Sequence, residues 1–241
     1  FHIWPRGKFM FIAMPNLDGS FTCTLFLPFE GEVAFENLQT REDIKDFFSR
    51  YFPSVKPEIE NLCGDFMKNP TSALVTIKCY PWTYWDKVAL VGDSAHAVVP
   101  FFGQGMNAGF EDISVLADLM GAHGDDWETI FGQYQQARKP NADAIAELSY
   151  RNFIEMSTRT ADPDFLLQKK IERHFAAQYP EKWIPAYSRV TFSERPYAEA
   201  LEVGDRQEAI MKEIMKLPDL ENRWDSPEVT RRILDLIDGG A

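Results

Sequence analysis

The residues best suited to chemistry stand close together, in the stretch from 91 to 109. An apolar run, residues 87–91, ends abruptly at Gly92 and Asp93, and a loop rich in Gly, Pro and Phe follows it. Asp93 can accept hydrogen bonds from sugar-like hydroxyls, and Gly92 allows a ligand to approach the backbone closely. The loop opens a helix, whose first N–H groups, near residues 106–108, can stabilise an anion. The stretch therefore predicts a site for a ligand that carries both hydroxyls and negative charge.

Two other interpretations of this stretch have to be weighed. For a Gly–Asp pair alone, the commoner case is a capped turn beside glycines that merely shape a surface loop. The glycines of residues 103–109 also resemble a dinucleotide-binding fingerprint, but three residues rather than two precede the last glycine. They follow a long loop instead of the strand itself, so the spacing and the context are both wrong. No other segment of the sequence supplies that fingerprint.

The whole string from 91 to 109 resembles the flavin-binding motif of the class A flavoprotein hydroxylases. Within that group the sequence is similar to the kynurenine 3-monooxygenase family. Four segments carry this narrower resemblance, in the same order as in the family, and they are residues 1–6, 100–112, 150–156 and 184–193. Members of the group need a dinucleotide-binding fingerprint to hold the ADP part of FAD. Because none is found here, we expect a C-terminal part of such an enzyme, with the missing N-terminal half as its partner.

The resemblance implies an FAD site. Asp93 would bind the ribityl or neighbouring hydroxyls, and Met106 and Asn107 would lie against the flavin ring at the start of the helix. The cofactor-binding residues that it implies are Gly92, Asp93, Pro100, Gly105, Met106 and Asn107.

The resemblance also implies a site for L-kynurenine, formed by Phe102, Asn152, Met156 and Tyr187. Asn152 shares an expected helical stripe with Ile145, Leu148 and Met156, and burying an amide without a partner costs on the order of 1 to 3 kcal/mol. Ligand binding would explain that amide. The alternatives are an Asn152 that bonds a neighbouring backbone group and a Tyr187 that is a core residue with its hydroxyl at the surface.

The reaction implied is the hydroxylation of L-kynurenine to 3-hydroxykynurenine in tryptophan catabolism, with NADPH and dioxygen as co-substrates and a flavin C4a-hydroperoxide as the oxidant. The aniline nitrogen activates the ring, so we assign no catalytic acid or base and interpret His96 as a structural hydrogen-bonding residue. Two alternatives stay open: a related flavin hydroxylase of another aromatic acid or phenol, and a non-catalytic helical module that binds an aromatic acid or a protein. By itself the chain is expected to be inactive.

Composition restricts the function further. The net charge of -12 disfavours binding to nucleic acid, and no apolar run approaches the roughly 20 residues of a membrane-spanning helix. The first residues lack the features of a signal peptide, and Cys23, Cys63 and Cys79 fit reduced thiols. The scattered histidines predict no metal site. We therefore expect a cytoplasmic protein without a stable membrane anchor.

The expected fold class is α+β. Residues 9–13 and 20–27 predict a β-hairpin, and Thr40 followed by Asp43 predicts a capping box that opens a helix ending near Pro53. A second helix is expected over residues 58–67, followed by a strand over 73–77.

The C-terminal two thirds are expected to be mainly helical. Residues 87–91 predict a buried strand, and residues 108–120 predict a helix with Phe110, Ile113, Leu116 and Met120 on one face. Trp82, Tyr84 and Trp85 are interpreted as core or interface residues. From Trp127 onward helices are expected, with breaks near Pro140, Pro163, Pro180, Pro185, Pro196 and Pro218, and one helix is expected to begin near Asn141.

Three parts follow from these patterns and the resemblance. Residues 1–79 are expected to form part of a substrate-binding β-sheet domain with two helices. Residues 80–140 are expected to form the C-terminal part of the FAD-binding domain, and residues 141–241 a helical region that caps the substrate.

Overall fold

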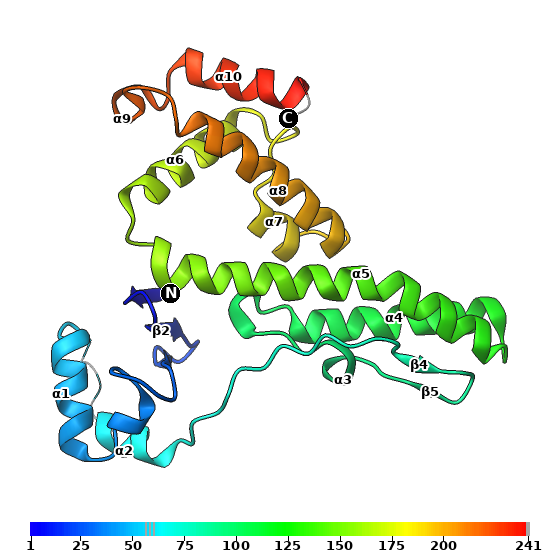
Figure 1. Cartoon of the computed structure of the whole chain (residues 1–241), viewed down its shortest axis with the longest axis horizontal. Coiled ribbons are helices and arrows are strands. Elements are labelled where there is room, and N and C mark those ends of the chain that lie inside the picture. Colours follow the sequence, from blue (N-terminus) through cyan, green and yellow to red (C-terminus); the bar gives the residue numbers. More distant parts are fainter. Residues whose placement is uncertain (56, 58, 60, 240–241) are drawn as a thin grey trace. The chain divides into compact units, whose positions relative to one another are not determined.

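The computed structural model describes every residue except 56, 58, 60 and 240–241 (Figure 1). The chain forms two compact units: residues 1–73 with 154–162 make unit 1, and residues 74–153 with 163–241 make unit 2. Unit 1 combines an antiparallel sheet with helices, and unit 2 is mainly helical. The predicted α+β class is confirmed.

Unit 1 contains the predicted hairpin. Strands β1 (His2–Pro5), β2 (Met10–Pro15) and β3 (Phe21–Phe26) form an antiparallel sheet in chain order. In the turn between β2 and β3, Asp18 Oδ1 accepts hydrogen bonds from the backbone N–H of Ser20 at 2.9 Å and from its hydroxyl at 2.6 Å. A short polar side chain thus satisfies the turn backbone, as expected for such a sequence.

The helix after the hairpin is also confirmed. Helix α1 (Arg41–Tyr51) follows the short 3-10 helix η1 (Phe35–Asn37) and opens with the predicted capping box. Thr40 Oγ1 accepts from Asp43 N at 3.1 Å, and Asp43 Oδ2 accepts from Thr40 N at 2.8 Å. The buried face of α1 packs on the sheet through an aromatic core that includes Phe9, Phe11, Phe47, Phe48 and Phe52.

Helix α2 (Leu62–Lys68) begins later than predicted, because its first helical hydrogen bond joins Asp65 N to Asn61 O. Residues 58 and 60 of the prediction lie outside the described residues. Unit 1 also contains η4 (Glu155–Arg159), a π-helical turn whose Ser157 O accepts a 2.9 Å hydrogen bond from Gly7 N.

Two strand predictions are wrong. Residues 73–77 belong to no strand, and the apolar run 87–91 contributes only β5 (Val88–Ala89), which pairs with β4 (Thr83–Tyr84). A buried strand needs neighbours on both sides, and in the described part of the chain β5 has only β4. Val88 is consequently half exposed. Of the nearby aromatic residues only Trp82 is buried, so Tyr84 and Trp85 are not core residues.

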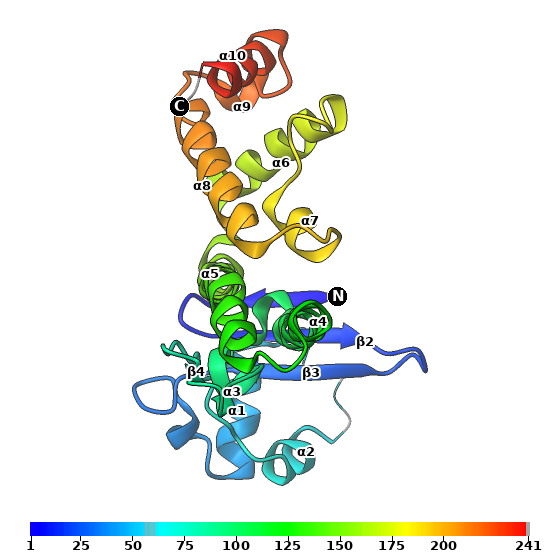
Figure 2. The ribbon, with the colours of Figure 1, turned by 90° about the vertical axis from the view of Figure 1, so that its right-hand side faces the viewer.

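The first helices of unit 2 lie in and beside the predicted loop between residues 91 and 109, and the others follow it along the chain. They are α3 (Asp93–His96), the 3-10 helix η3 (Pro100–Phe102), α4 (Gly105–His123), α5 (Trp127–Ile154), α6 (Pro163–Gln178), α7 (Ala186–Thr191), α8 (Tyr197–Ile214), α9 (Leu220–Arg223) and α10 (Pro227–Asp238). Helix α4 lies alongside α5 (Figures 1 and 2). Breaks occur near five of the six prolines, as predicted.

Pro140 does not break its helix. Helix α5 begins at Trp127 and continues through Pro140 to Ile154, so the predicted helix start near Asn141 is wrong. A proline inside a helix costs roughly 3 kcal/mol. Buried residues on both sides of it, including Arg138, Ala142, Ala144 and Ile145, offset this cost by packing.

Candidate functional site

The Gly92–Asp93 turn has the geometry that its sequence predicts. Gly92 has a φ of 61°, in the left-handed region that favours glycine. The turn lies against α4, since a Cβ on Gly109 would be in van der Waals contact with Gly92 Cα at 3.6 Å. Asp93 begins α3 and is exposed, and no hydrogen bond to its carboxylate is found within the described residues. The carboxylate is therefore available to a ligand.

A buried ionic network holds this turn in place. Asp112 of α4 is 0% exposed and accepts hydrogen bonds from Gly92 N at 3.0 Å, from His96 Nε2 at 2.5 Å and from Arg138 Nε at 2.7 Å. Arg138 also donates to Glu111 at 2.7 Å and to the backbone oxygen of Ala108. Helices α4 and α5 are thus joined directly behind the Gly92 turn.

These contacts decide the charge of the network. Burial raises the pKa of Asp112, but the hydrogen bonds from His96, Arg138 and the Gly92 N–H outweigh burial and hold its pKa below the ordinary value. Asp112 is therefore an anion that balances the buried Arg138 guanidinium. His96, interpreted from the sequence as a structural hydrogen-bonding residue, is buried and bonded to Asp112.

The loop between α3 and α4 is held by helix α5. Asn152 Nδ2 donates a 2.7 Å hydrogen bond to the backbone oxygen of Phe101, and the Phe101 and Phe153 rings lie 4.8 Å apart. The amide nitrogen of Asn152 therefore bonds a backbone group, as the alternative interpretation of this residue expected. Pro100 opens η3, and Gly103 ends it with a φ of 65°.

Phe102 and Tyr187, both predicted to contact substrate, lie together. Their rings stack with centroids 5.6 Å apart and an interplanar angle of 26°. Tyr187 is 52% exposed, so it is not a core tyrosine. Unit 2 therefore brings together Phe102, Asn152 and Tyr187 around one loop. Met156 lies on η4, the π-helical turn that follows α5, and belongs to unit 1.

The start of α4 presents the remaining predicted residues. Met106 and Asn107 are exposed, and Gly105 is the first helical residue. Ala108 N donates the first backbone hydrogen bond of this helix, to Gln104 O. The preceding N–H groups have no acceptor inside the helix, as at every helix start, and they carry partial positive charge.

Three residues around this site were not singled out from the sequence. Asp112 and Arg138 form the buried network, and Tyr197 of α8 donates a 3.0 Å hydrogen bond to Gln104 Oε1. Asp112 is the last residue of one of the segments that carry the family resemblance. An aspartate between apolar positions of an expected helix could have indicated a buried charge. Nothing in the local pattern pointed to Arg138 or Tyr197.

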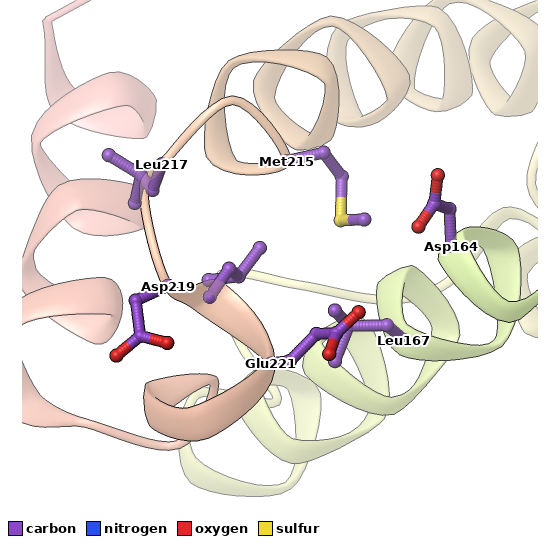
Figure 3. Close-up of a pocket in the computed structure, with 7 residues that line it drawn as sticks. Asp164, Leu167, Met215, Leu217, Asp219 and Glu221 are labelled. Carbon is purple, nitrogen blue, oxygen red and sulfur yellow. The ribbon is translucent and has the colours of Figure 1, made fainter.

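A separate cavity of about 270 Å³ lies among the C-terminal helices (Figure 3). It is lined by apolar and acidic side chains, which are Asp164, Leu167, Met215, Leu217, Asp219, Leu220 and Glu221. None of them was predicted to bind a ligand. Among the described residues no group of three or more potential ligands could hold a metal ion, and no helix is long and apolar enough to cross a membrane.

Comparison with known proteins shows which proteins this chain resembles. Residues 79–149 match the family described as an FAD binding domain. Kynurenine 3-monooxygenases from Christiangramia forsetii and Flavobacterium johnsoniae are each 65% identical over 98% of this chain, and the chain covers 53% of each relative. This chain is similar to about half of a kynurenine 3-monooxygenase. The kynurenine 3-monooxygenase of Dictyostelium discoideum is 45% identical over 89% of the chain, which covers 49% of that relative.

The matched FAD-binding segment contains all six predicted cofactor residues and the Asp112–Arg138 network. The observed donor and acceptor set suits FAD, since it combines an available carboxylate at Asp93, a closely approachable backbone at Gly92 and the open N-terminus of α4. The similarity to kynurenine 3-monooxygenases extends beyond this segment, to residues in both units.

Proposed function

We propose that this chain is part of an FAD-dependent monooxygenase that uses NADPH and dioxygen to hydroxylate L-kynurenine to 3-hydroxykynurenine. The observation that carries the proposal is 65% identity to kynurenine 3-monooxygenases along 98% of the chain. The chain spans about half the length of these relatives. We therefore infer that the rest of such an enzyme supplies the remainder of the flavin site. The free cysteines are consistent with a reducing, cytoplasmic location.

The proposed flavin site uses Gly92, Asp93, Pro100, Gly105, Met106 and Asn107. Bound FAD would supply the redox chemistry that activates dioxygen. Asp93 would accept hydrogen bonds from the ribityl or neighbouring hydroxyls, and Gly92 would let the cofactor approach the backbone. The N-terminus of α4 would stabilise negative charge on the reduced ring.

The proposed substrate site uses Phe102, Asn152, Met156 and Tyr187. The stacked rings of Phe102 and Tyr187 would form an apolar wall against the aromatic ring of kynurenine and would keep water out. Asn152 would hold the loop through Phe101 O and would also contact the amino-acid end of the substrate. No acid–base pair is required, because the aniline nitrogen already activates the ring carbon that is hydroxylated.

The functional division that we propose has three parts. Residues 1–79 would belong to the substrate-binding sheet domain, residues 80–140 to the FAD-binding domain, and residues 141–241 to a helical cap over the substrate. The matched FAD-binding segment, residues 79–149, supports the central part.

An exposed apolar face on α4 supports the inferred partner half. Phe110, Ile113 and Met120 are 64%, 53% and 45% exposed, although they lie on one side of the helix. Apolar patches of this kind are usually covered in a functional protein. We propose that the remaining half of the enzyme covers them.

Replacing Phe110 by lysine should leave the stability of the isolated chain unchanged and weaken its association with the other half by about tenfold to a hundredfold, because burial of a phenylalanine contributes roughly 1.5 to 3 kcal/mol. Titration calorimetry of this chain against the N-terminal half of the Christiangramia forsetii relative measures the association. Leu166→Lys is the matched control, since Leu166 is also half exposed but lies on α6. Equal weakening by both substitutions would exclude α4 as the contact face.

A spectroscopic experiment tests the proposed function and separates the alternatives. The chain is joined to the N-terminal half of the Christiangramia forsetii relative, and the visible spectrum of bound flavin is recorded with L-kynurenine and with simple phenols. The proposal predicts that kynurenine alone perturbs the spectrum. A response to phenols only would favour a hydroxylase of another aromatic compound. Failure to retain flavin would favour the non-catalytic helical module.

Asn152→Ala should raise the KM for kynurenine about fivefold to tenfold with a smaller change in kcat, because it removes a hydrogen bond worth roughly 1 kcal/mol and loosens the substrate loop. Steady-state kinetics of the joined protein measure both constants. Asn222→Ala is the control: its side chain bonds Asp219 beside α9 and not the loop that contains Phe101. An unchanged KM for Asn152→Ala would remove this residue from the proposed site.

A further inference from the structure

The beginning of helix α8 is hydrogen-bonded to the loop that opens α4. Tyr197, the first residue of α8, is 3% exposed, and its hydroxyl lies 3.0 Å from Gln104 Oε1. The same oxygen accepts a second hydrogen bond, also 3.0 Å long, from Asn107 Nδ2. A single side-chain carbonyl thus joins a tyrosine far along the chain to a residue in the first turn of α4.

The chemistry of these groups fixes the direction of both hydrogen bonds. Burial, together with the negative charge of Glu111, raises the pKa of Tyr197, so its hydroxyl keeps its proton and donates it. Asn107 Nδ2 can only donate. Gln104 must therefore present its oxygen to both partners, which leaves its amide nitrogen directed at Phe102 O, 3.4 Å away. Buried polar groups are rarely left without partners, and in this arrangement the Tyr197 hydroxyl and both polar atoms of the Gln104 amide each have one.

Tyr197 is itself held firmly. Its neighbour Ala198 donates a 3.1 Å hydrogen bond from the backbone to Asn141 Oδ1 on α5. Tyr197 also belongs to a buried apolar cluster with Ala108 of α4 and Ile145 of α5. The tyrosine is a fixed point, against which the exposed Asn107 side chain is oriented through Gln104.

We propose that Tyr197 is a positioning residue for the flavin-binding turn of α4, which it orients through Gln104 and Asn107. The inference rests on the proposed function, in which Asn107 lies against the flavin. It assigns to the helical C-terminal region a part in holding the cofactor, in addition to covering the substrate.

Tyr197→Phe tests the proposal, because it removes the hydroxyl and keeps the ring that fills the core. In the protein joined to the N-terminal half of the Christiangramia forsetii relative, we expect the dissociation constant of FAD, measured by flavin fluorescence, to rise about fivefold, which corresponds to one hydrogen bond. Amide hydrogen exchange at Ala108, whose N–H bonds Gln104 O, should accelerate by a similar factor. In a Gln104→Met background, Tyr197→Phe should have no further effect on either quantity.

Tyr179→Phe is the control, since the ring of Tyr179 is partly buried against Phe175 among the C-terminal helices rather than beside the loop before α4. We expect it to change neither quantity by more than about twofold. Equal effects of the two substitutions, or additive effects of Tyr197→Phe and Gln104→Met, would overturn the proposal. Hydrogen exchange needs neither flavin nor substrate, so it decides the positioning role separately. A joined protein that binds flavin but ignores kynurenine would count only against the proposed substrate.

Discussion

Alanine at position 93 is expected to weaken FAD binding by about a hundredfold. The Asp93 carboxylate is exposed at the start of α3, and hydrogen bonds to a charged group contribute roughly 1.5 to 3 kcal/mol each. Losing those to the cofactor hydroxyls should therefore release most of the flavin. Fluorescence titration of the joined protein measures the dissociation constant.

Asp118→Ala provides the control for this prediction. Asp118 is also an exposed aspartate, but it lies in the second half of α4, away from the Gly92 turn. Its replacement removes the same charge and should leave FAD binding unchanged. If Asp93→Ala bound FAD as tightly as Asp118→Ala, the proposed role of the Gly92–Asp93 turn would be wrong.

The second large effect is expected from Asp112→Asn, which should lower the free energy of unfolding by about 3 to 5 kcal/mol. Removing one partner of a buried ion pair leaves the other charge poorly compensated, here that of Arg138, whose remaining carboxylate partner, Glu111, is half exposed. Urea unfolding of the joined protein measures the change. Glu147→Gln, which breaks the partly exposed surface pair with Arg151, should cost no more than about 1 kcal/mol.

The effect of Asp112→Asn should also depend on pH. The pKa of Asp112 is lower in the folded chain than its ordinary value, so its ionised form contributes stability above that ordinary value, about 3.9. This contribution is lost as the pH falls through the lower, folded-state pKa. The difference in stability between the native chain and Asp112→Asn should therefore be constant near neutral pH and shrink below about pH 4. A difference that grew on acidification would contradict the ionic network.

Local signals predicted the parts of the fold that depend on neighbouring residues. The capping box at Thr40 and Asp43 and the hairpin turn at Asp18 each use side chains within a few positions of one another. Such contacts depend little on the rest of the chain. For the same reason the prolines other than Pro140 marked helix boundaries correctly.

The features that were not predicted from the sequence depend on packing between residues that are far apart in the chain. Helix α5 continues through Pro140 because buried neighbours hold it, and residues 87–91 form only a short strand because β5 has a single neighbour in the described part of the chain. Tyr197 and Gln104 are 93 positions apart, so no local period could pair them. The roles of the individual site residues stay predictions.

Product formation by the joined protein tests the central claim most directly. L-kynurenine, NADPH and dioxygen are supplied, and 3-hydroxykynurenine is quantified by mass spectrometry together with NADPH oxidation. We predict kynurenine-dependent NADPH oxidation that yields 3-hydroxykynurenine and disappears in Asp93→Ala. A flavin-loaded protein that leaves kynurenine unchanged under these conditions would contradict the proposed function.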